Sequence, residues 1–202
     1  MRLPGLALKS SWRPYRARPG ERVITIRSRR TFPPGHPTTR LCLELLGGLS
    51  LSGRRLLDVG CGTGILALAG AALGAELCVG VDLSWAAVKL SKENARENRL
   101  DHKIFVAKGS TECLRGPFQV VAANLPAGVQ LAKVEELSRL ASKDATLILS
   151  GFRDSQEDEP RLLYDRAGWS VRSRLTKDEF CIELPPEKSF TWVAWRLERS
   201  EQ

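Results

Sequence analysis

The chain has 202 residues, of which 43% are hydrophobic and 27% are charged, and its formal net charge at pH 7 is +8. This length suits one domain with its own hydrophobic core and is too short for two domains of ordinary size. No apolar run approaches the ~18 residues that a membrane-spanning helix needs, so the sequence predicts a globular protein without a membrane span.

The positive charge is concentrated near the amino terminus. Residues 1–40 contain ten Lys/Arg residues and one acidic residue, whereas the rest of the chain is close to neutral. Residues 1–20 are rich in proline, glycine and arginine, so we expect a basic arm over residues 1–30 and a domain over residues 31–202. With Trp12 and Tyr15 available for stacking, the arm suits nucleic acid; a solvated tail or a targeting peptide are alternative interpretations.

Hydrophobic periodicity predicts the elements that follow the arm. An alternating stretch at residues 22–27 predicts a short strand, and Thr38 or Thr39 starts a helix after a proline-rich loop. Strands are then expected at 54–59, 76–81, 103–107, 118–123, 145–150, 169–175 and 189–197, and helices at 65–73, 85–98, 129–141 and 157–167. This alternation predicts an α/β fold: a doubly wound, mainly parallel, seven-stranded Rossmann-like sheet with helices on both faces.

The five cysteines form no CxxC pair, and four of them lie in apolar contexts. We therefore expect buried, reduced thiols in a cytoplasmic protein, with neither disulfides nor a metal site. The cysteines are Cys42, Cys61, Cys78, Cys113 and Cys181.

A glycine-rich loop after the first core strand is the most informative motif. Gly60, Gly62 and Gly64 precede a helix, which lets a ligand lie against bare backbone. A dinucleotide-binding loop would need glycine at position 65, where the chain has Ile65. The spacing is instead typical of loops that bind S-adenosylmethionine (SAM), and Asp82, ~20 residues later, suits the two hydroxyls of a ribose.

Further stretches carry a resemblance to one family. Residues 32–46 include a His-Pro-Thr-Thr helix start, residues 57–67 include the glycine loop, and residues 109–110, 116–124 and 147–151 match as well. Together they resemble the PrmA-type ribosomal-protein lysine methyltransferases, which are class I SAM-dependent enzymes. Members of this family usually carry a separate amino-terminal recognition domain, which we expect to be missing because only ~30 residues precede the match.

The resemblance, and the residues at the carboxyl ends of the predicted strands, together predict a cofactor site. Ser110 follows the third core strand, where adenine usually lies. Each candidate also has a structural explanation: Thr39 or Asp82 as a helix cap, Ser110 as a plain turn residue, and Asn124 as the end of a strand. No general base is evident, so no catalytic residue is assigned, and His36 is a weaker candidate. The candidate cofactor-binding residues are Thr39, Gly60, Gly62, Asp82, Ser110 and Asn124.

We therefore predict a SAM-dependent methyltransferase that releases S-adenosylhomocysteine and modifies a protein amine, with a ribosomal-protein lysine as the leading acceptor. Two alternatives stay open: an RNA methyltransferase that uses the basic arm, and a non-catalytic binding subunit with the same fold. The intact glycines and Asp82 argue against a non-catalytic scaffold, which has no need of them.

Overall fold

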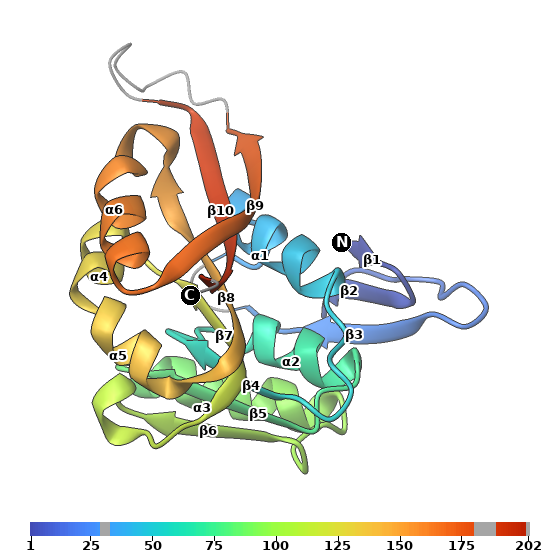
Figure 1. The fold of residues 1–202 in the computed structure, drawn as a ribbon. Coiled ribbons are helices and arrows are strands. Elements are labelled where there is room, and N and C mark those ends of the chain that lie inside the picture. The colour runs from blue at the N-terminus through green and yellow to red at the C-terminus, as the bar shows by residue number, and fades with distance from the viewer. Residues whose placement is uncertain (29–32, 180–188, 201–202) are drawn as a thin grey trace.

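The computed structural model describes residues 1–28, 33–179 and 189–200, and within them a seven-stranded sheet forms the centre of the molecule (Figure 1). Its strands are β4 Arg55–Val59, β5 Leu77–Asp82, β6 Ile104–Lys108, β7 Phe118–Asn124, β8 Ala141–Arg153, β9 Trp169–Asp178 and β10 Thr191–Arg199. The order is β6-β5-β4-β7-β8-β10-β9; β10 runs antiparallel to both neighbours, and the other adjacent strands pair in parallel. The predicted doubly wound, mainly parallel sheet is confirmed.

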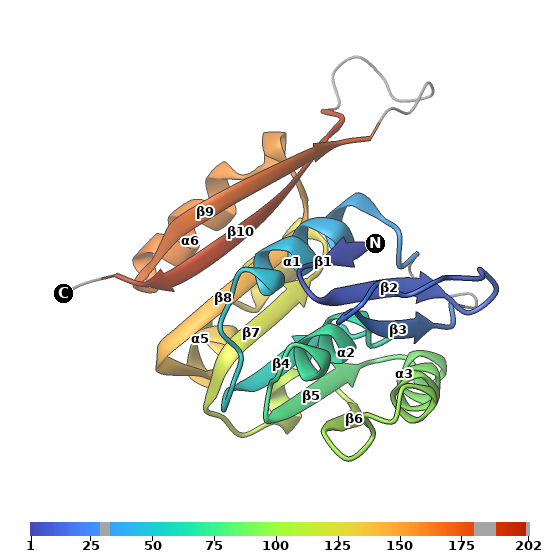
Figure 2. The same ribbon diagram turned by 90° about the vertical axis from the view of Figure 1, so that its right-hand side faces the viewer.

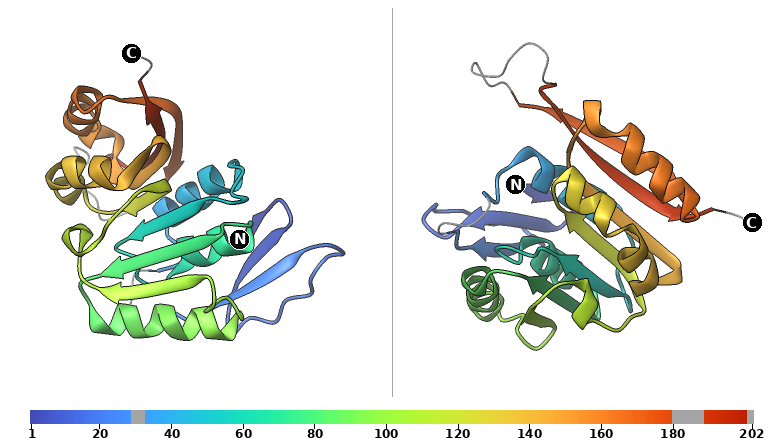
Figure 3. Two further views of the ribbon diagram at one scale, coloured as in Figure 1. Left: turned by 60° about the horizontal axis from the view of Figure 1, so that its bottom comes forward. Right: turned by 90° about the vertical axis from the view of Figure 1, so that its left-hand side faces the viewer.

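Helices cover both faces of this sheet, as Figures 2 and 3 show. One face is covered by α1 Pro37–Gly47, α2 Ile65–Ala72 and α3 Trp85–Glu97, and the other by α4 Ala127–Ala132, α5 Val134–Leu140 and α6 Asp158–Arg166. Two short 3-10 turns, η1 Thr111–Cys113 and η2 Asp154–Gln156, complete the elements. Each face has its own cluster of buried apolar side chains, so the sheet separates two cores.

Two predicted helices differ from the observed ones. The helix expected over residues 129–141 is α4 followed by α5, which meet at Lys133. The buried Gln130 side chain donates to the carbonyls of Ala123 (2.7 Å) and Ser150 (3.0 Å) and so fixes α4 against the end of the sheet. The first helix begins at Pro37 rather than at a threonine, with His36 as its cap.

The amino-terminal residues differ most from expectation. They form a separate sheet of β1 Arg2–Leu3, β2 Leu6–Ser10 and β3 Arg22–Ile26, in which β2 pairs in parallel with β3. The strand predicted at 22–27 is confirmed as β3; no strand was predicted within residues 1–20, whereas residues 6–10 form β2 and residues 6–8 are buried. Leu6 and Leu8 join the core beside α1 and α2, a tertiary contact that their short apolar run did not reveal.

Asn94 of α3 and Asn98, which caps the end of that helix, complete the free edge of β3. Asn98 accepts from the amide of Thr25 (2.7 Å) and donates back to its carbonyl (2.8 Å), as a neighbouring strand would. Asn94 accepts from the amide of Arg27 (2.9 Å) and donates to the carbonyl of Thr63 in the glycine loop (2.9 Å). The amino-terminal sheet is therefore hydrogen-bonded both to α3 and, through Asn94, to the predicted ligand loop.

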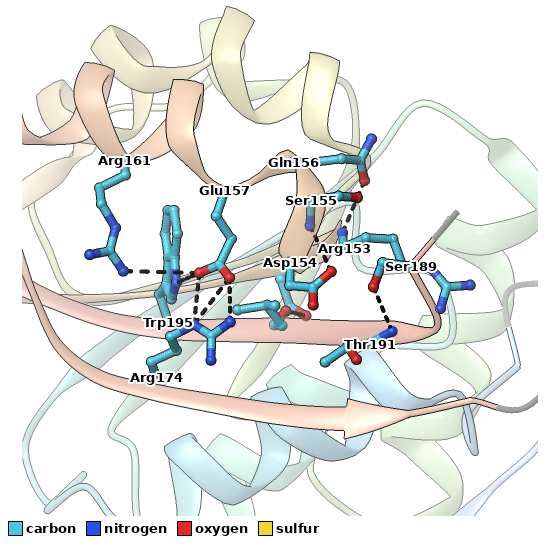
Figure 4. A network of polar contacts seen from close by, with 12 residues as sticks. Arg153, Asp154, Ser155, Gln156, Glu157, Arg161, Arg174, Ser189, Thr191 and Trp195 are labelled. Atoms are coloured by element: carbon cyan, nitrogen blue, oxygen red, sulfur yellow. Dashed lines mark hydrogen bonds and ion pairs between the residues drawn. The ribbon is translucent and has the colours of Figure 1, made fainter. Parts of the chain in front are cut away.

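A buried carboxylate attaches α6 to the β9–β10 hairpin (Figure 4). Glu157, 7% exposed, accepts from Nε of Arg174 (2.9 Å) and from the indole nitrogen of Trp195 (2.8 Å). Arg161 lies 4.0 Å away on the next turn of the helix. These contacts hold the hairpin that forms one rim of the site described below.

The described residues contain no helix long and apolar enough to cross a membrane, and no cluster of three or more His, Cys, Asp or Glu side chains arranged to hold a metal ion. Cys42, Cys61 and Cys78 are buried free thiols, and burial raises the pKa of Cys42 and of Cys78 to about 12. Cys113 is free and exposed, and Cys181 lies outside the described residues.

Candidate active site

A cavity of about 350 Å³ opens beyond the carboxyl ends of β4 and β7, where parallel sheets bind ligands. Its walls come from the start of α1, the glycine loop, the segment after β7, and the hairpin strand β10. Among the lining residues are His36, Thr38, Thr39, Asp58, Gly60, Cys61, Gly62, Asn124, Leu125, Pro126 and Trp192. The cavity therefore unites residues that lie up to 158 positions apart in the sequence, from Pro34 to Trp192.

The glycine loop needs glycine for two separate reasons. Gly60 has φ +70°, and a Cβ there would lie 2.5 Å from Cδ2 of Leu125; a Cβ on Gly64 would lie 2.2 Å from Oγ of Ser91. Gly62 has room for a Cβ but has φ +53°, a conformation that disfavours side chains. The loop thus packs tightly on its protein side while it leaves bare backbone along the cavity.

Asp82 supports this loop from the end of β5. One carboxylate oxygen accepts from the amide of Gly62 (2.9 Å), and the other accepts from the amide of Ser84 (2.8 Å). Ser84 caps α3 as its sequence position suggests, accepting from Ala87 (3.4 Å). Asp82 is half-buried and does not line the cavity itself; it lies next to the loop, at the amide of Gly62, and each of its oxygens can accept a second hydrogen bond.

Asn124 and Thr39 meet across the cavity wall. The amide nitrogen of Asn124 donates to Oγ1 of Thr39 (3.4 Å), and the buried Oδ1 of Asn124 accepts no hydrogen bond from the described residues. Thr39 is buried in the first turn of α1, so the alternative that it caps this helix is wrong; Nδ1 of His36 accepts the capping bond from Thr38. A buried acceptor without a donor is costly, so a ligand donor at Asn124 would be stabilised.

Asp58 is a site residue that the sequence analysis missed. It lies in β4, is 2% exposed and lines the cavity. Burial, and next the charge of Asp82, raise its pKa to about 7, although Asp58 also accepts from the amide of Ala67 (3.1 Å). A carboxyl group with a raised pKa in a cavity is a functional candidate. The sequence feature that could have revealed Asp58 is an acidic residue inside an apolar strand.

Ser110 lies apart from the other candidates. It follows β6 at the same edge of the sheet as Asp82, where the amide of Gly109 donates to the carbonyl of Asp82 (3.0 Å). Ser110 does not line the cavity, and its carbonyl accepts from the amide (3.2 Å) and from Sγ (3.0 Å) of Cys113. The structure thus unites Thr39, Gly60, Gly62 and Asn124 in the cavity, and Asp82 adjoins them through its hydrogen bond to the amide of Gly62.

Trp192 of β10 forms part of the rim of the cavity, and no sequence motif pointed to it. Its ring meets that of His36 edge-on with centroids 4.9 Å apart, while the guanidinium of Arg153 lies 3.7 Å from its centroid. Its indole nitrogen donates to Glu179 (2.6 Å). Burial lowers the pKa of His36, with Glu179 acting in the opposite direction, so a neutral imidazole is favoured at this rim.

Comparison with known proteins agrees with this geometry. Residues 4–184 match the family model described as ribosomal protein L11 methyltransferase (PrmA). The chain is 43% identical over 132 residues to a ribosomal protein L11 methyltransferase of Azotobacter vinelandii, covering 65% of this chain and 45% of the relative. It is 37% identical over 145 residues to one of Thermotoga petrophila, covering 72% and 54%. The chain thus spans about half the length of these curated relatives.

Solved structures show the same fold. A ribosomal protein L11 methylase of Lactobacillus delbrueckii subsp. bulgaricus superposes with a TM-score of 0.82 at 22% identity, covering 97% of this chain and 94% of that one. A tRNA methyltransferase of B. subtilis superposes with a TM-score of 0.63 at 13% identity, covering 79% and 65%. At these identities the likeness concerns the fold alone.

Proposed function

The chain belongs to the ribosomal protein L11 methyltransferase (PrmA) family, and from that premise we propose that it transfers a methyl group from SAM to an amine of a protein. A ribosomal-protein lysine is the leading acceptor, because the curated relatives are named for ribosomal protein L11. The observation that carries the proposal is one cavity that joins the glycine loop to the buried, unpartnered Oδ1 of Asn124. The buried thiols of the described chain suit a reducing compartment, and we infer a cytoplasmic location.

The residues of the cavity, together with Asp82 and Ser110 at the ends of the neighbouring strands, fit SAM. Gly60 and Gly62 present backbone that a ligand can approach closely, and Asp82 keeps acceptor capacity for the two ribose hydroxyls. Thr39 would contact the amino-acid end of the cofactor, and Ser110, outside the cavity, would lie toward the adenine. Asp58, in its ionised form, would attract the positive charge of this ligand.

The other side of the cavity suits an amine. Pro126 and Trp192 provide apolar walls, and Oδ1 of Asn124 is an acceptor for an N–H group. A free lysine has a pKa of ~10.4, so deprotonation at pH 7 costs ~4–5 kcal/mol. An apolar wall disfavours the charged ammonium and reduces this cost.

When bound, SAM supplies a methyl group that its positive sulfonium already activates. The contribution of the chain is then to hold the amine in line and to exclude water, and alignment of this kind provides a large share of a rate enhancement. Asn124 would orient the amine through its Oδ1, and Thr39 would hold the amide of Asn124 in place. The lysine would lose its proton to solvent before it enters the cavity, so none of these residues is assigned as a general base.

Transfer of tritiated methyl groups tests the proposal. The protein is incubated with labelled SAM and either purified ribosomal protein L11 or ribosomal RNA. We expect label in protein. Asn124→Ala should reduce the rate ~5- to 150-fold, as expected for a lost hydrogen bond of ~1–3 kcal/mol. The matched control is Gln119→Ala, which removes a side-chain amide at the opposite end of β7, away from the cavity. This variant should retain the rate.

Label in ribonuclease-sensitive material with none in protein would favour the RNA methyltransferase alternative. Binding of SAM without transfer to either acceptor would favour the non-catalytic alternative. Equal losses for Asn124→Ala and Gln119→Ala would contradict the role of Asn124.

A further inference from the structure

A second cavity, of about 520 Å³, lies between the amino-terminal sheet and the start of α1. Its lining shares Pro34 and Ile65 with the candidate active site, so the two cavities adjoin. We propose that this cavity and residues 11–21 beside it form a docking surface for single-stranded RNA. The choice of RNA over DNA rests on the proposed function, because a ribosomal acceptor is presented beside RNA.

The charge of this surface is positive and unbalanced. Lys9, Arg13 and Arg40 line the cavity, and none of its described lining residues is acidic. None of these three forms an ion pair with a carboxylate in the described part of the chain; the ammonium of Lys9 donates to the carbonyl of Arg13 (3.3 Å). Phosphates would neutralise these charges and release the counterions that otherwise accompany RNA.

The single acidic residue of this region is already engaged elsewhere. Glu21 accepts from the hydroxyl of Tyr15 (2.7 Å) and from the amide of Arg18 (3.0 Å), and it lies 3.5 Å from the guanidinium of Arg2. It therefore balances Arg2 and braces the loop, while the charges that face the cavity stay free for a polyanion. The loop also contributes Arg16, which is exposed.

An exposed indole stands beside these charges. Trp12 is 72% exposed, and the guanidinium of Arg13 lies 4.7 Å from its ring centroid. Nucleobases stack on such a ring with little preference for sequence, and only unpaired bases can do so. An acidic peptide would use the charges but leave the indole in water, so the pairing of Trp12 with Arg13 favours single-stranded RNA.

Equilibrium binding of the full chain to a fluorescein-labelled, single-stranded RNA of about 12 nucleotides tests this inference. Arg13→Ala/Arg40→Ala should weaken binding at least tenfold at low salt and reduce the slope of log affinity against log salt by ~1.4. Trp12→Ala should weaken binding ~5- to 100-fold and leave the slope unchanged, and Trp12→Phe should restore most of the affinity. All of these side chains are exposed, and circular dichroism checks that the variants fold.

The matched control is Lys89→Ala/Lys92→Ala, which removes two charges from the exposed face of α3 and should retain affinity within about twofold. An equal loss in this control, an unaffected Trp12→Ala variant, or tighter binding of the matching DNA strand or of poly-glutamate would overturn the inference. Methyl transfer to free protein is measured separately. Its absence with intact RNA binding contradicts only the proposed function, and absent RNA binding with intact transfer contradicts only this inference.

Discussion

Asp82 connects the glycine loop to the start of α3, because its two carboxylate oxygens accept from the amides of Gly62 and Ser84. If its remaining acceptor capacity holds the ribose, Asp82→Ala should weaken binding of S-adenosylhomocysteine by ~1.5–3 kcal/mol, the scale of charge-assisted hydrogen bonds. Isothermal titration calorimetry measures this loss.

A ligand analogue separates ribose binding from loop support. If Asp82 contacts the hydroxyls, the substitution should cost much less affinity for the 2′-deoxy form of the ligand. Equal losses for the two ligands would mean that Asp82 acts only by holding Gly62 in place.

Ionisation of the buried Asp58 at neutral pH should lower the free energy of unfolding. Its pKa is raised from 3.8 to about 7 in the folded chain, chiefly by burial. Between these values the unfolded chain has lost the proton that the folded chain keeps, so stability should fall as pH rises from about 4 to 7. Asp58→Asn removes this loss and should stabilise the ligand-free protein at pH 8 by up to ~4 kcal/mol.

Urea unfolding of both proteins between pH 4 and pH 8 checks this expectation. The gap between wild type and Asp58→Asn should grow with pH. A gap that stays constant over this range would contradict a raised pKa at this position.

At the scale of single residues, the sequence predicts best where a local rule applies. Gly60, Gly62 and Asp82 were found because a loop between a strand and a helix and an acid at the next strand end form one short pattern. Trp192 was missed because it reaches the cavity only through pairing of β10 with β8 and β9, which no local pattern encodes. Asp58 could have been predicted, because burying an acidic residue in an apolar strand is costly and therefore indicates a function.

Among the elements, the β9–β10 hairpin depends on Glu157 for its attachment to α6. Glu157→Ala leaves the buried indole N–H of Trp195 without an acceptor, and we expect a loss of ~1–3 kcal/mol in the free energy of unfolding. The ion pair adds little more, because the Arg174 side chain is 41% exposed and returns to water. Chemical denaturation measures the loss.

Two further variants make this test specific. Glu157→Gln retains an acceptor for Trp195 and should cost less than Glu157→Ala. Glu159→Ala removes an exposed carboxylate from the same helix and should be nearly neutral. A cost for Glu159→Ala as large as that for Glu157→Ala would point to helix charge rather than to the buried contact.

The inner strands β4 and β7 were predictable because burial on both faces gives continuous apolar runs between clear turns. β2 was not, because its core contacts come from α1 and α2 rather than from a pattern of its own. The break at Lys133 was missed for a similar reason: Gln130 is held by carbonyls of β7 and β8.

At the scale of the whole molecule, the amino-terminal sheet and the active-site cavity are parts of one packed body. Leu6, Leu8, Ile24 and Ile26 share a core with α1 and α2, and Asn94 links β3 to the glycine loop. Both proposed surfaces therefore lie on a continuous side of the molecule, next to the start of α1.

A crystal structure of the chain with S-adenosylhomocysteine tests the central claim most directly. We predict that the amino-acid end of the ligand occupies the cavity between the glycine loop and Asn124, toward Thr39 and Asp58, and that the ligand extends past Gly62 so that its ribose hydroxyls contact Asp82. A ligand bound elsewhere, or no bound ligand at millimolar concentration, would contradict the account.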